Sequence, residues 1–182
     1  MAFFFLKWYT YKKREEETYM LQIKTEPLTH DAFALFGDFY DMSAPEGHCL
    51  TGELHRFYPD RIRDAYTGRI GFSALTVRKP ERRVITQLEY HTRTTEILMP
   101  LDDDAILHVS PASGAAPAVR ETRAFLVPKG TLVQLKPCVW HLCALPAHID
   151  TLHVLLAIEE CTYMNDCTVI DLNEADRFEI VD

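Results

Sequence analysis

Apolar residues along most of this chain occur in short alternating or continuous runs. Turn-forming segments that contain Pro, Gly, Asp or Asn separate these runs. The helical crossovers of about 10–15 residues that a parallel sheet requires are missing between them. The pattern therefore predicts a mainly β domain, an antiparallel barrel or sandwich, whose strands cover residues 71–78, 84–91, 96–99, 105–109, 122–127, 132–135, 151–158 and 168–172.

Two weaker signals precede these runs. Residues 21–24 alternate between apolar and polar side chains, as a strand does. Thr29 is a good N-cap for a short helix that ends near Gly37. A loop rich in turn formers follows at 41–47, and a second Ser/Gly/Ala/Pro-rich loop at 110–117 is expected to be mobile.

Residues 1–19 differ from the rest of the chain. An aromatic run at 3–9 is followed by basic and then acidic residues. A signal peptide has the opposite order, because its positive charges precede its apolar core. We interpret this segment as an extension and expect the domain to begin at Met20; a membrane-surface anchor is the alternative.

Composition narrows the class of protein. A chain of 182 residues is long enough for one domain with a substantial core. Its formal charge of −8 argues against nucleic acid as the partner. The five cysteines are odd in number and form no CxxC pair, which favours reduced thiols in a cytoplasmic protein. No apolar run approaches the ~20 residues of a transmembrane helix.

The candidate chemistry lies around residues 89–96. Glu89 and His91 are two residues apart on a predicted strand, so they share one of its faces. Glu96 has the opposite parity and joins them only if a bulge or bend occurs near residues 94–95. His141 follows a strand bracketed by Gly and Pro. Two imidazoles and two carboxylates could together hold a divalent first-row metal.

These segments resemble the two sequence motifs of cupins, which are small double-stranded β-helix or jelly-roll barrels. The first cupin motif has two His one residue apart and a later Glu; here Glu89 stands where the first His is usual. The chain is most similar to the ureidoglycolate lyase family of cupins. That similarity runs from Met20 to the C-terminus and is carried by residues 27–33, 36–38, 78–80, 88–91, 97–100, 123–125, 139–141 and 165–167.

The resemblance implies a cupin-like barrel over residues 20–182 with a few short helices. It also implies cleavage of ureidoglycolate to glyoxylate and urea, a step of allantoin and purine catabolism, by a homodimeric enzyme. His91 and His141 are the expected acid–base pair, or ligands of an Mn, Ni, Zn or Fe ion together with Glu96. Glu89 would orient these histidines or coordinate the ion.

The substrate that the resemblance implies is a small carboxylate, for which a planar guanidinium is the natural partner. We expect Arg123 or Arg78 to bind it, with Trp140 lining the pocket. A structural ion pair is the alternative for Arg123, and core packing beside Trp140 is the alternative for His141.

Three positions depart from the family pattern. Leu142 replaces a His after the Trp-His pair, Cys138 replaces Gly, and Glu96 stands where Gln or another residue is usual. Leu142 and Cys138 favour a second hypothesis, in which the chain is a binding module or sensor for a small carboxylate. A cupin isomerase would use the same pocket and is a third.

Overall fold

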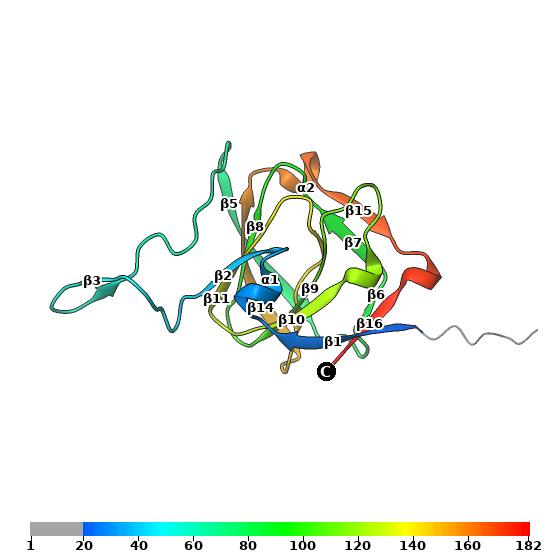
Figure 1. The fold of residues 1–182 in the computed structure, drawn as a ribbon, viewed down its shortest axis with the longest axis horizontal. Coiled ribbons are helices and arrows are strands. Elements are labelled where there is room, and N and C mark those ends of the chain that lie inside the picture. The colour runs from blue at the N-terminus through cyan, green and yellow to red at the C-terminus, as the bar shows by residue number, and fades with distance from the viewer. Residues whose placement is uncertain (1–19) are drawn as a thin grey trace, which may run out of the picture.

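A computed structural model describes residues 20–182, and its strands form two curled sheets with a projecting hairpin (Figure 1). The predictions made for residues 1–19 lie outside the described residues. The elements are β1 (Leu21–Pro27), α1 (His30–Phe33), β2 (Gly37–Asp41), β3 (Leu50–Thr51), β4 (Arg56–Phe57), β5 (Ile70–Arg78), β6 (Val84–Ile85), β7 (Gln87–Tyr90), β8 (Glu96–Pro100), β9 (Ala105–Ser110), β10 (Arg123–Val127), β11 (Thr131–Leu135), β12 (Trp140–His141), β13 (Leu145–Pro146), β14 (Thr151–Glu159), α2 (Thr162–Asn165), β15 (Thr168–Asp171) and β16 (Phe178–Val181).

The larger sheet has nine strands in the order β15-β7-β12-β9-β10-β1-β16-β6, with β13 also paired to β9. The two ends of this sheet are close in sequence, because Thr86 alone separates β6, the last strand in the order, from β7, the second strand. The smaller sheet has five strands in the order β2-β11-β8-β14-β5. The predicted mainly β, jelly-roll barrel with short helices is confirmed. None of the helices in residues 20–182 is both long and apolar enough to cross a membrane.

Each of the eight predicted runs contains a strand, and the pairs that these strands form with one another are antiparallel. The antiparallel prediction is wrong for β1, which pairs in parallel with both β10 and β16. The run 84–91 is two strands, because the chain passes at Thr86 from one end of the nine-stranded sheet to the other.

The helix after Thr29 is present and is capped as predicted, since the backbone N–H of Ala32 donates to Thr29 Oγ1. It ends at Phe33, earlier than expected. Gly37 begins β2, where a Cβ atom would lie 1.9 Å from the carbonyl oxygen of Gln134. That glycine therefore permits the close pairing of β2 with β11.

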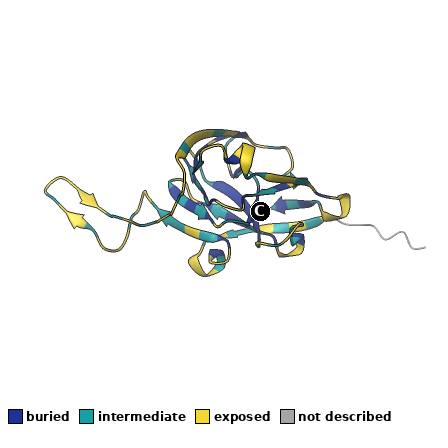
Figure 2. Ribbon diagram, turned by 90° about the horizontal axis from the view of Figure 1, so that it is seen from above, coloured by how far each residue is buried: buried dark blue, intermediate teal, exposed yellow. Residues whose placement is uncertain are grey.

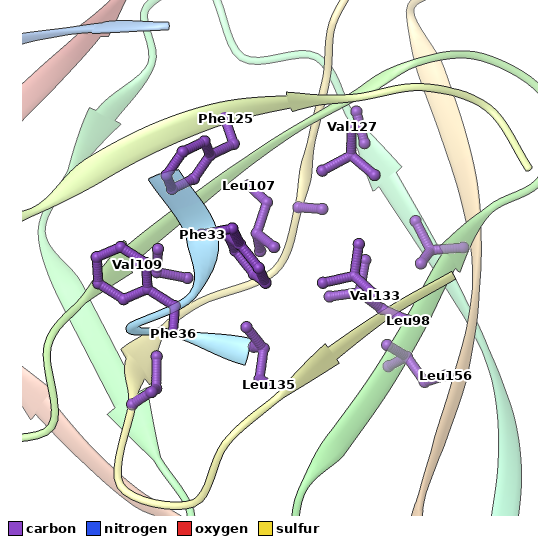
Figure 3. Packing of buried hydrophobic residues seen from close by; sticks show 14 of the residues in the cluster. Phe33, Phe36, Leu98, Leu107, Val109, Phe125, Val127, Val133, Leu135 and Leu156 are labelled. Atoms are coloured by element: carbon purple, nitrogen blue, oxygen red, sulfur yellow. The ribbon is translucent and has the colours of Figure 1, made fainter. Parts of the chain in front are cut away.

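Two apolar clusters lie on opposite faces of β9, as strand alternation requires. Leu107 and Val109 point into the first cluster, between the two sheets, where Phe33 and Phe125 also pack (Figure 3). Ile106 points into the second cluster, inside the curl of the nine-stranded sheet. The barrel interior that continues from Val109 is where the polar group described below lies.

His108 is buried in the second cluster, where its ring packs 6.1 Å from that of Phe178. Neither ring nitrogen has a hydrogen-bond partner among residues 20–182. Burial, with a smaller effect of His141, lowers the pKa of His108 to about 3. Below the ordinary histidine pKa of 6.5, His108 therefore binds a proton in the unfolded chain but not in the folded chain. The free energy of unfolding of wild type therefore decreases as the pH is lowered below 6.5.

We expect His108→Leu to raise the free energy of unfolding by about 1–2 kcal/mol at pH 7, because it removes unpaired polar atoms from an apolar core. The gain should increase at pH 5. Urea denaturation at both pH values measures it, with His108→Gln as the control that keeps a polar side chain. A lower stability of His108→Leu than of wild type at pH 5 contradicts this assignment.

Candidate functional site

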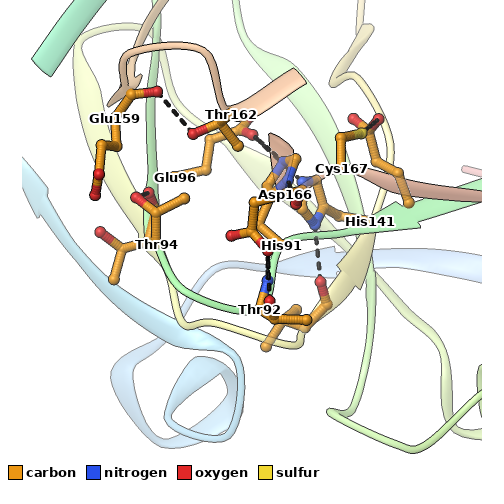
Figure 4. A network of polar contacts seen from close by, with 12 residues as sticks. His91, Thr92, Thr94, Glu96, His141, Glu159, Thr162, Asp166 and Cys167 are labelled. Atoms are coloured by element: carbon orange, nitrogen blue, oxygen red, sulfur yellow. Dashed lines mark hydrogen bonds and ion pairs between the residues drawn. The ribbon is translucent and has the colours of Figure 1, made fainter. Parts of the chain in front are cut away.

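Four polar side chains meet inside one end of the barrel (Figure 4). Glu89 on β7 and His141 on β12 are directly opposed in the nine-stranded sheet. His91 follows β7, and Glu96 begins β8 in the five-stranded sheet. The chain bends at residues 92–93 and crosses from one sheet to the other, which is how a residue of the wrong parity joins the group.

The distances within the group are short. Ligand atoms of Glu89, His91 and His141 all lie within 4.8 Å of one another. Glu96 Oε2 lies 3.1 Å from Nε2 of His91 and 3.5 Å from Nε2 of His141. The side chains of His91, Glu96 and His141 are 2%, 7% and 4% exposed, so solvent does not screen these contacts.

The other nitrogen of each imidazole is fixed by a backbone carbonyl. Nδ1 of His91 lies 2.9 Å from the oxygen of Asp166, and Nδ1 of His141 lies 2.9 Å from the oxygen of Val139. A carbonyl oxygen only accepts, so each Nδ1 carries a hydrogen. Both Nε2 atoms therefore point toward the carboxylates. Unprotonated Nε2 atoms and carboxylate oxygens are all acceptors, so protons or a metal cation must lie between them.

Without a metal, the group is a buried ion pair. Burial alone would raise the pKa of Glu96, but the contacts with His141 and His91 lower it to about 2. Burial disfavours a charged His141, but the carboxylate of Glu96 raises the pKa of this imidazole above its ordinary value. Glu96 Oε2 and His141 Nε2 attract as charges rather than through a well-formed hydrogen bond, since Nε2 has no partner within the described residues that satisfies hydrogen-bond geometry.

The same donor set fits a divalent metal. Two imidazole nitrogens with carboxylate oxygens are the ligands that Zn, Mn, Fe and Ni accept in proteins. His91, His141 and Glu89 would hold the ion, with Glu96 alongside. The Nδ1 contacts with backbone carbonyls are of the kind that orient metal-ligating histidines.

Residues 161–167 cover this group, and their role was not predicted. The ring of Tyr163 lies 6.0 Å from that of His91 in an edge arrangement. The thiol of Cys167 donates to Glu89 Oε2 over 3.2 Å, and burial together with Glu89 raises the pKa of this thiol to about 12. The carboxylate of Asp166 accepts from the backbone N–H groups of residues 92 and 93. The only sequence signal was the resemblance at 165–167, which assigned no role.

Two predicted substrate-binding residues lie away from the group. Trp140 points to the opposite face from His141, where it is fully buried, and its Nε1 donates to Ser113 Oγ over 2.9 Å. Arg78 on β5 is paired with Thr151 on β14. Thr151 lies six residues along β14 from the residue that is paired with Ile97, so Arg78 lies about 20 Å from the Glu96 end of the sheet.

Arg123 lies on the barrel-interior face, in register with Val109, which in turn is in register with His141. Its guanidinium pairs through two nitrogens with the carboxylate of Glu26, donates to the carbonyl oxygen of Ala32 over 2.7 Å, and lies over the ring of Phe125. These contacts are those of a structural ion pair, the alternative that the sequence left open.

Cys138 has a left-handed backbone, with φ of +67°, and its N–H donates to the carbonyl oxygen of His91 over 2.6 Å. A side chain in this conformation costs about 1 kcal/mol that glycine avoids. We expect Cys138→Gly to raise the free energy of unfolding by about this amount, measured by urea denaturation. Cys138→Ala keeps the penalty and is the control; equal stability of the two variants contradicts the explanation.

Comparison with known proteins gives the chain its family. A model of the ureidoglycolate lyase family matches residues 20–179. The curated ureidoglycolate lyase of Rhodobacter capsulatus is 30% identical over 125 residues, which are 67% of this chain and 77% of that protein.

Similar solved structures include a dTDP sugar isomerase from Desulfovibrio desulfuricans, with 12% identity, a TM-score of 0.49 and coverage of 78% of this chain and 85% of that one. Another is the Mn(II)-containing oxalate decarboxylase of Bacillus subtilis, with 17% identity, a TM-score of 0.41 and coverage of 58% of this chain and 24% of that one. The family match over residues 20–179 shows that this chain belongs to the ureidoglycolate lyase family.

Proposed function

We propose that this chain cleaves ureidoglycolate into glyoxylate and urea. The observation that carries the proposal is the buried convergence of His91, Glu96 and His141 with Glu89, in a chain of the ureidoglycolate lyase family. A site with an ionised carboxylate and a protonated imidazole in contact has a proton acceptor and a proton donor within one substrate's reach.

The reaction needs one proton removed and one supplied. A base removes the proton of the substrate hydroxyl, and the oxygen lone pair forms the carbonyl of glyoxylate. The C–N bond breaks at the same carbon, and its electron pair goes to the urea nitrogen. An acid then protonates that nitrogen, so atoms and charge balance without an added oxidant or reductant.

We assign these roles to the two imidazoles. His141, whose pKa is raised by Glu96 although burial opposes it, donates the proton to the departing urea nitrogen. His91, whose Nδ1–H is held by the carbonyl of Asp166, accepts the hydroxyl proton at Nε2 when that atom is unprotonated. Glu96 contacts both rings and holds them in place as the charge shifts from one to the other.

The same residues would also serve a metal form. An Mn, Ni, Zn or Fe ion held by His91, His141 and Glu89 would supply a Lewis acid beside the hydroxyl and carboxylate oxygens of the substrate. Proton transfer in that form would fall to Glu96, because both imidazoles would be ligands.

Access to the group involves the segment that covers it. A polar cavity of about 210 Å³ lies between residues of α2 and the bend after His91, lined in part by Arg93, Thr94 and Asp166. We propose that substrate approaches from this side and that residues 161–167 move to admit it. The free thiols of all five cysteines support the proposal of a reducing, cytoplasmic location.

Turnover of ureidoglycolate tests the proposal. Purified chain, treated with chelator and then supplied with Mn²⁺, Ni²⁺, Zn²⁺ or no metal, should release glyoxylate faster than buffer in at least one condition. Activity with chelator present would favour the imidazole acid–base form, and activity with one metal alone would favour the metal form. Rates equal to buffer in every condition would refute the lyase proposal.

The second candidate function is a binding module for a small carboxylate. It is favoured by Cys138 and Leu142, which depart from the family pattern beside His141. This function predicts that glyoxylate raises the thermal unfolding temperature of the chain while no ureidoglycolate is consumed. The same protein sample therefore separates the two functions.

A further inference from the structure

Two connections cross the same gap between the two sheets, at the end of the barrel that holds the buried polar group. Residues 91–95 join β7 of the nine-stranded sheet to β8 of the five-stranded sheet, and residues 160–167 join β14 to β15 in the reverse direction. Because β14 pairs with β8 and β15 pairs with β7, the two connections start and end beside one another. Contacts between them therefore bear directly on the geometry of the group.

Asp166 joins the two connections through its side chain. Its carboxylate accepts hydrogen bonds from the backbone N–H of Thr92 over 3.0 Å, from that of Arg93 over 2.8 Å, and from the hydroxyl of Thr92. We call these three hydrogen bonds the Asp166 clamp. Buried residues lie mainly within the barrel, and exposed residues lie on its turns and on the projecting hairpin (Figure 2). Thr92 and Arg93 belong to such an exposed turn, but the Asp166 side chain is 7% exposed, so water competes little for its oxygens.

The backbone of the same residue holds His91. The carbonyl oxygen of Asp166 accepts from Nδ1–H of His91 over 2.9 Å (Figure 4). One residue thus contacts three consecutive residues, 91, 92 and 93. The clamp fixes the position of the Asp166 backbone, and that backbone sets which nitrogen of His91 carries the hydrogen. Nε2 is left to face Glu96 over 3.1 Å.

The two imidazoles of the group differ in how they are held. Nδ1 of His141 contacts the carbonyl of Val139, two residues earlier in the chain. That contact is local, so it remains when residues 160–167 move. The partner of His91 lies 75 residues away along the chain, in the connection itself. His91 is therefore oriented only while residues 160–167 are in place.

The group is closed to solvent in this structure. The side chains of His91 and His141 are 2% and 4% exposed, so a substrate reaches their Nε2 atoms only when a covering segment moves. Tyr163 and Met164 in the covering segment are 50% and 86% exposed, so their packing contributes little to keeping it closed. The clamp is thus a main attachment of residues 160–167 to the bend after His91.

We propose that Asp166 is a positioning residue, whose clamp makes closure of residues 160–167 and orientation of His91 a single event. This role rests on the proposed function, because it concerns the step in which Nε2 of His91 takes the hydroxyl proton of the substrate. Asp166 does not touch the reacting atoms and transfers no proton. Its consequence is that the proton acceptor is set only after the substrate is enclosed.

NMR of chelator-treated chain, labelled with nitrogen-15, tests the clamp. Wild type should show a slowly exchanging Nδ1–H signal of His91, assigned by its absence from His91→Gln. The backbone amides of residues 92 and 93 lie on an exposed turn, but they should be protected to a similar degree, because one opening motion releases all three hydrogens. Asp166→Ala should lose the Nδ1–H signal, although it keeps the carbonyl group that accepts this hydrogen.

The same variant should lower kcat for ureidoglycolate about 10–100-fold, as loss of a group that orients a functional histidine does. Its KM should stay within about threefold of wild type, because Asp166 does not touch the substrate. Asp166→Asn keeps one acceptor oxygen and should fall between wild type and Asp166→Ala in both measurements. The matched control is Asp171→Ala on β15, which loses a 2.8 Å hydrogen bond from Gln87 on β7 and should match wild type in both.

Retention of the Nδ1–H signal by Asp166→Ala would overturn the proposal. So would a wild-type kcat in a variant that has lost the signal. Unprotected amides at residues 92 and 93 of wild type would also overturn it, and that measurement needs no variant to fold. A wild type that does not cleave ureidoglycolate would refute the lyase function instead, while loss of the signal in Asp166→Ala would still support the clamp.

Discussion

Replacing His141 with alanine should lower kcat/KM for ureidoglycolate by about 10²–10⁴-fold, the usual contribution of a positioned proton donor or acceptor. The ring is buried, its Nδ1 is fixed by the carbonyl of Val139, and its Nε2 lies against the group that contains Glu96. Leu142 follows it in the chain, so no second imidazole is adjacent to it in sequence. Initial rates of glyoxylate release, in the condition where wild type is most active, measure the loss.

The control for this variant is His153→Ala. That imidazole is half exposed on β14 and pairs with Asp102, and it has no contact with the buried group. It should retain wild-type kcat/KM. A His141→Ala variant within threefold of wild type would remove this residue from the mechanism.

Glu96→Gln should lower the free energy of unfolding by about 3 kcal/mol at pH 5.5 in the presence of chelator, because it leaves a buried imidazolium without its counter-charge. Burial alone would make the carboxylate a weaker acid, but its contacts with His141 and His91 lower the pKa of Glu96 to about 2. Urea denaturation of wild type and variant measures the difference.

The pH dependence of that difference follows from the two directions. The contribution of Glu96, whose pKa is depressed, is fully present above its ordinary value of 4.5 and is lost as pH falls towards about 2. The contribution of His141, whose pKa is raised, is fully present below 6.5 and is lost as pH rises through the higher folded value. The variant should therefore differ most from wild type between pH 4.5 and 6.5.

Glu179→Gln is the matched carboxylate control. Glu179 pairs with Arg82 at the surface, where the Arg82 side chain is 63% exposed, and such pairs contribute little. A pH-independent effect of Glu96→Gln, or one no larger than that of Glu179→Gln, would show that the buried ion pair does not form.

The strands that the sequence predicts well are those with a pattern strong enough to read locally. β9 and β14 have long apolar runs, and Thr29 caps its helix through a local contact. Short strands such as β12 and β13 are two residues long and are defined by the strands beside them: β9 pairs with both, and β7 also pairs with β12. Their formation depends on tertiary pairing, which no local pattern records.

The candidate site divides in the same way. The shared face of Glu89 and His91 follows from strand parity alone. The position of Glu96 required knowing that the chain changes sheets at residues 92–93. Adjacency in sequence does not place two strand residues in the same pocket. Trp140 is adjacent to His141 in sequence, but it points to the other face of the sheet, into the second apolar cluster. Arg123 likewise has a charge partner, Glu26, that is 97 residues away along the chain.

The proposed lyase function requires the buried His91–Glu96–His141 group to break the C–N bond of ureidoglycolate. NMR of the products that the purified chain forms from carbon-13-labelled ureidoglycolate gives their identity and amount. Wild type should form equal amounts of glyoxylate and urea faster than they form in buffer, and His141→Ala should form them at the buffer rate. Ammonia in place of urea, or the same rate for wild type, His141→Ala and buffer, would refute the lyase function of this group.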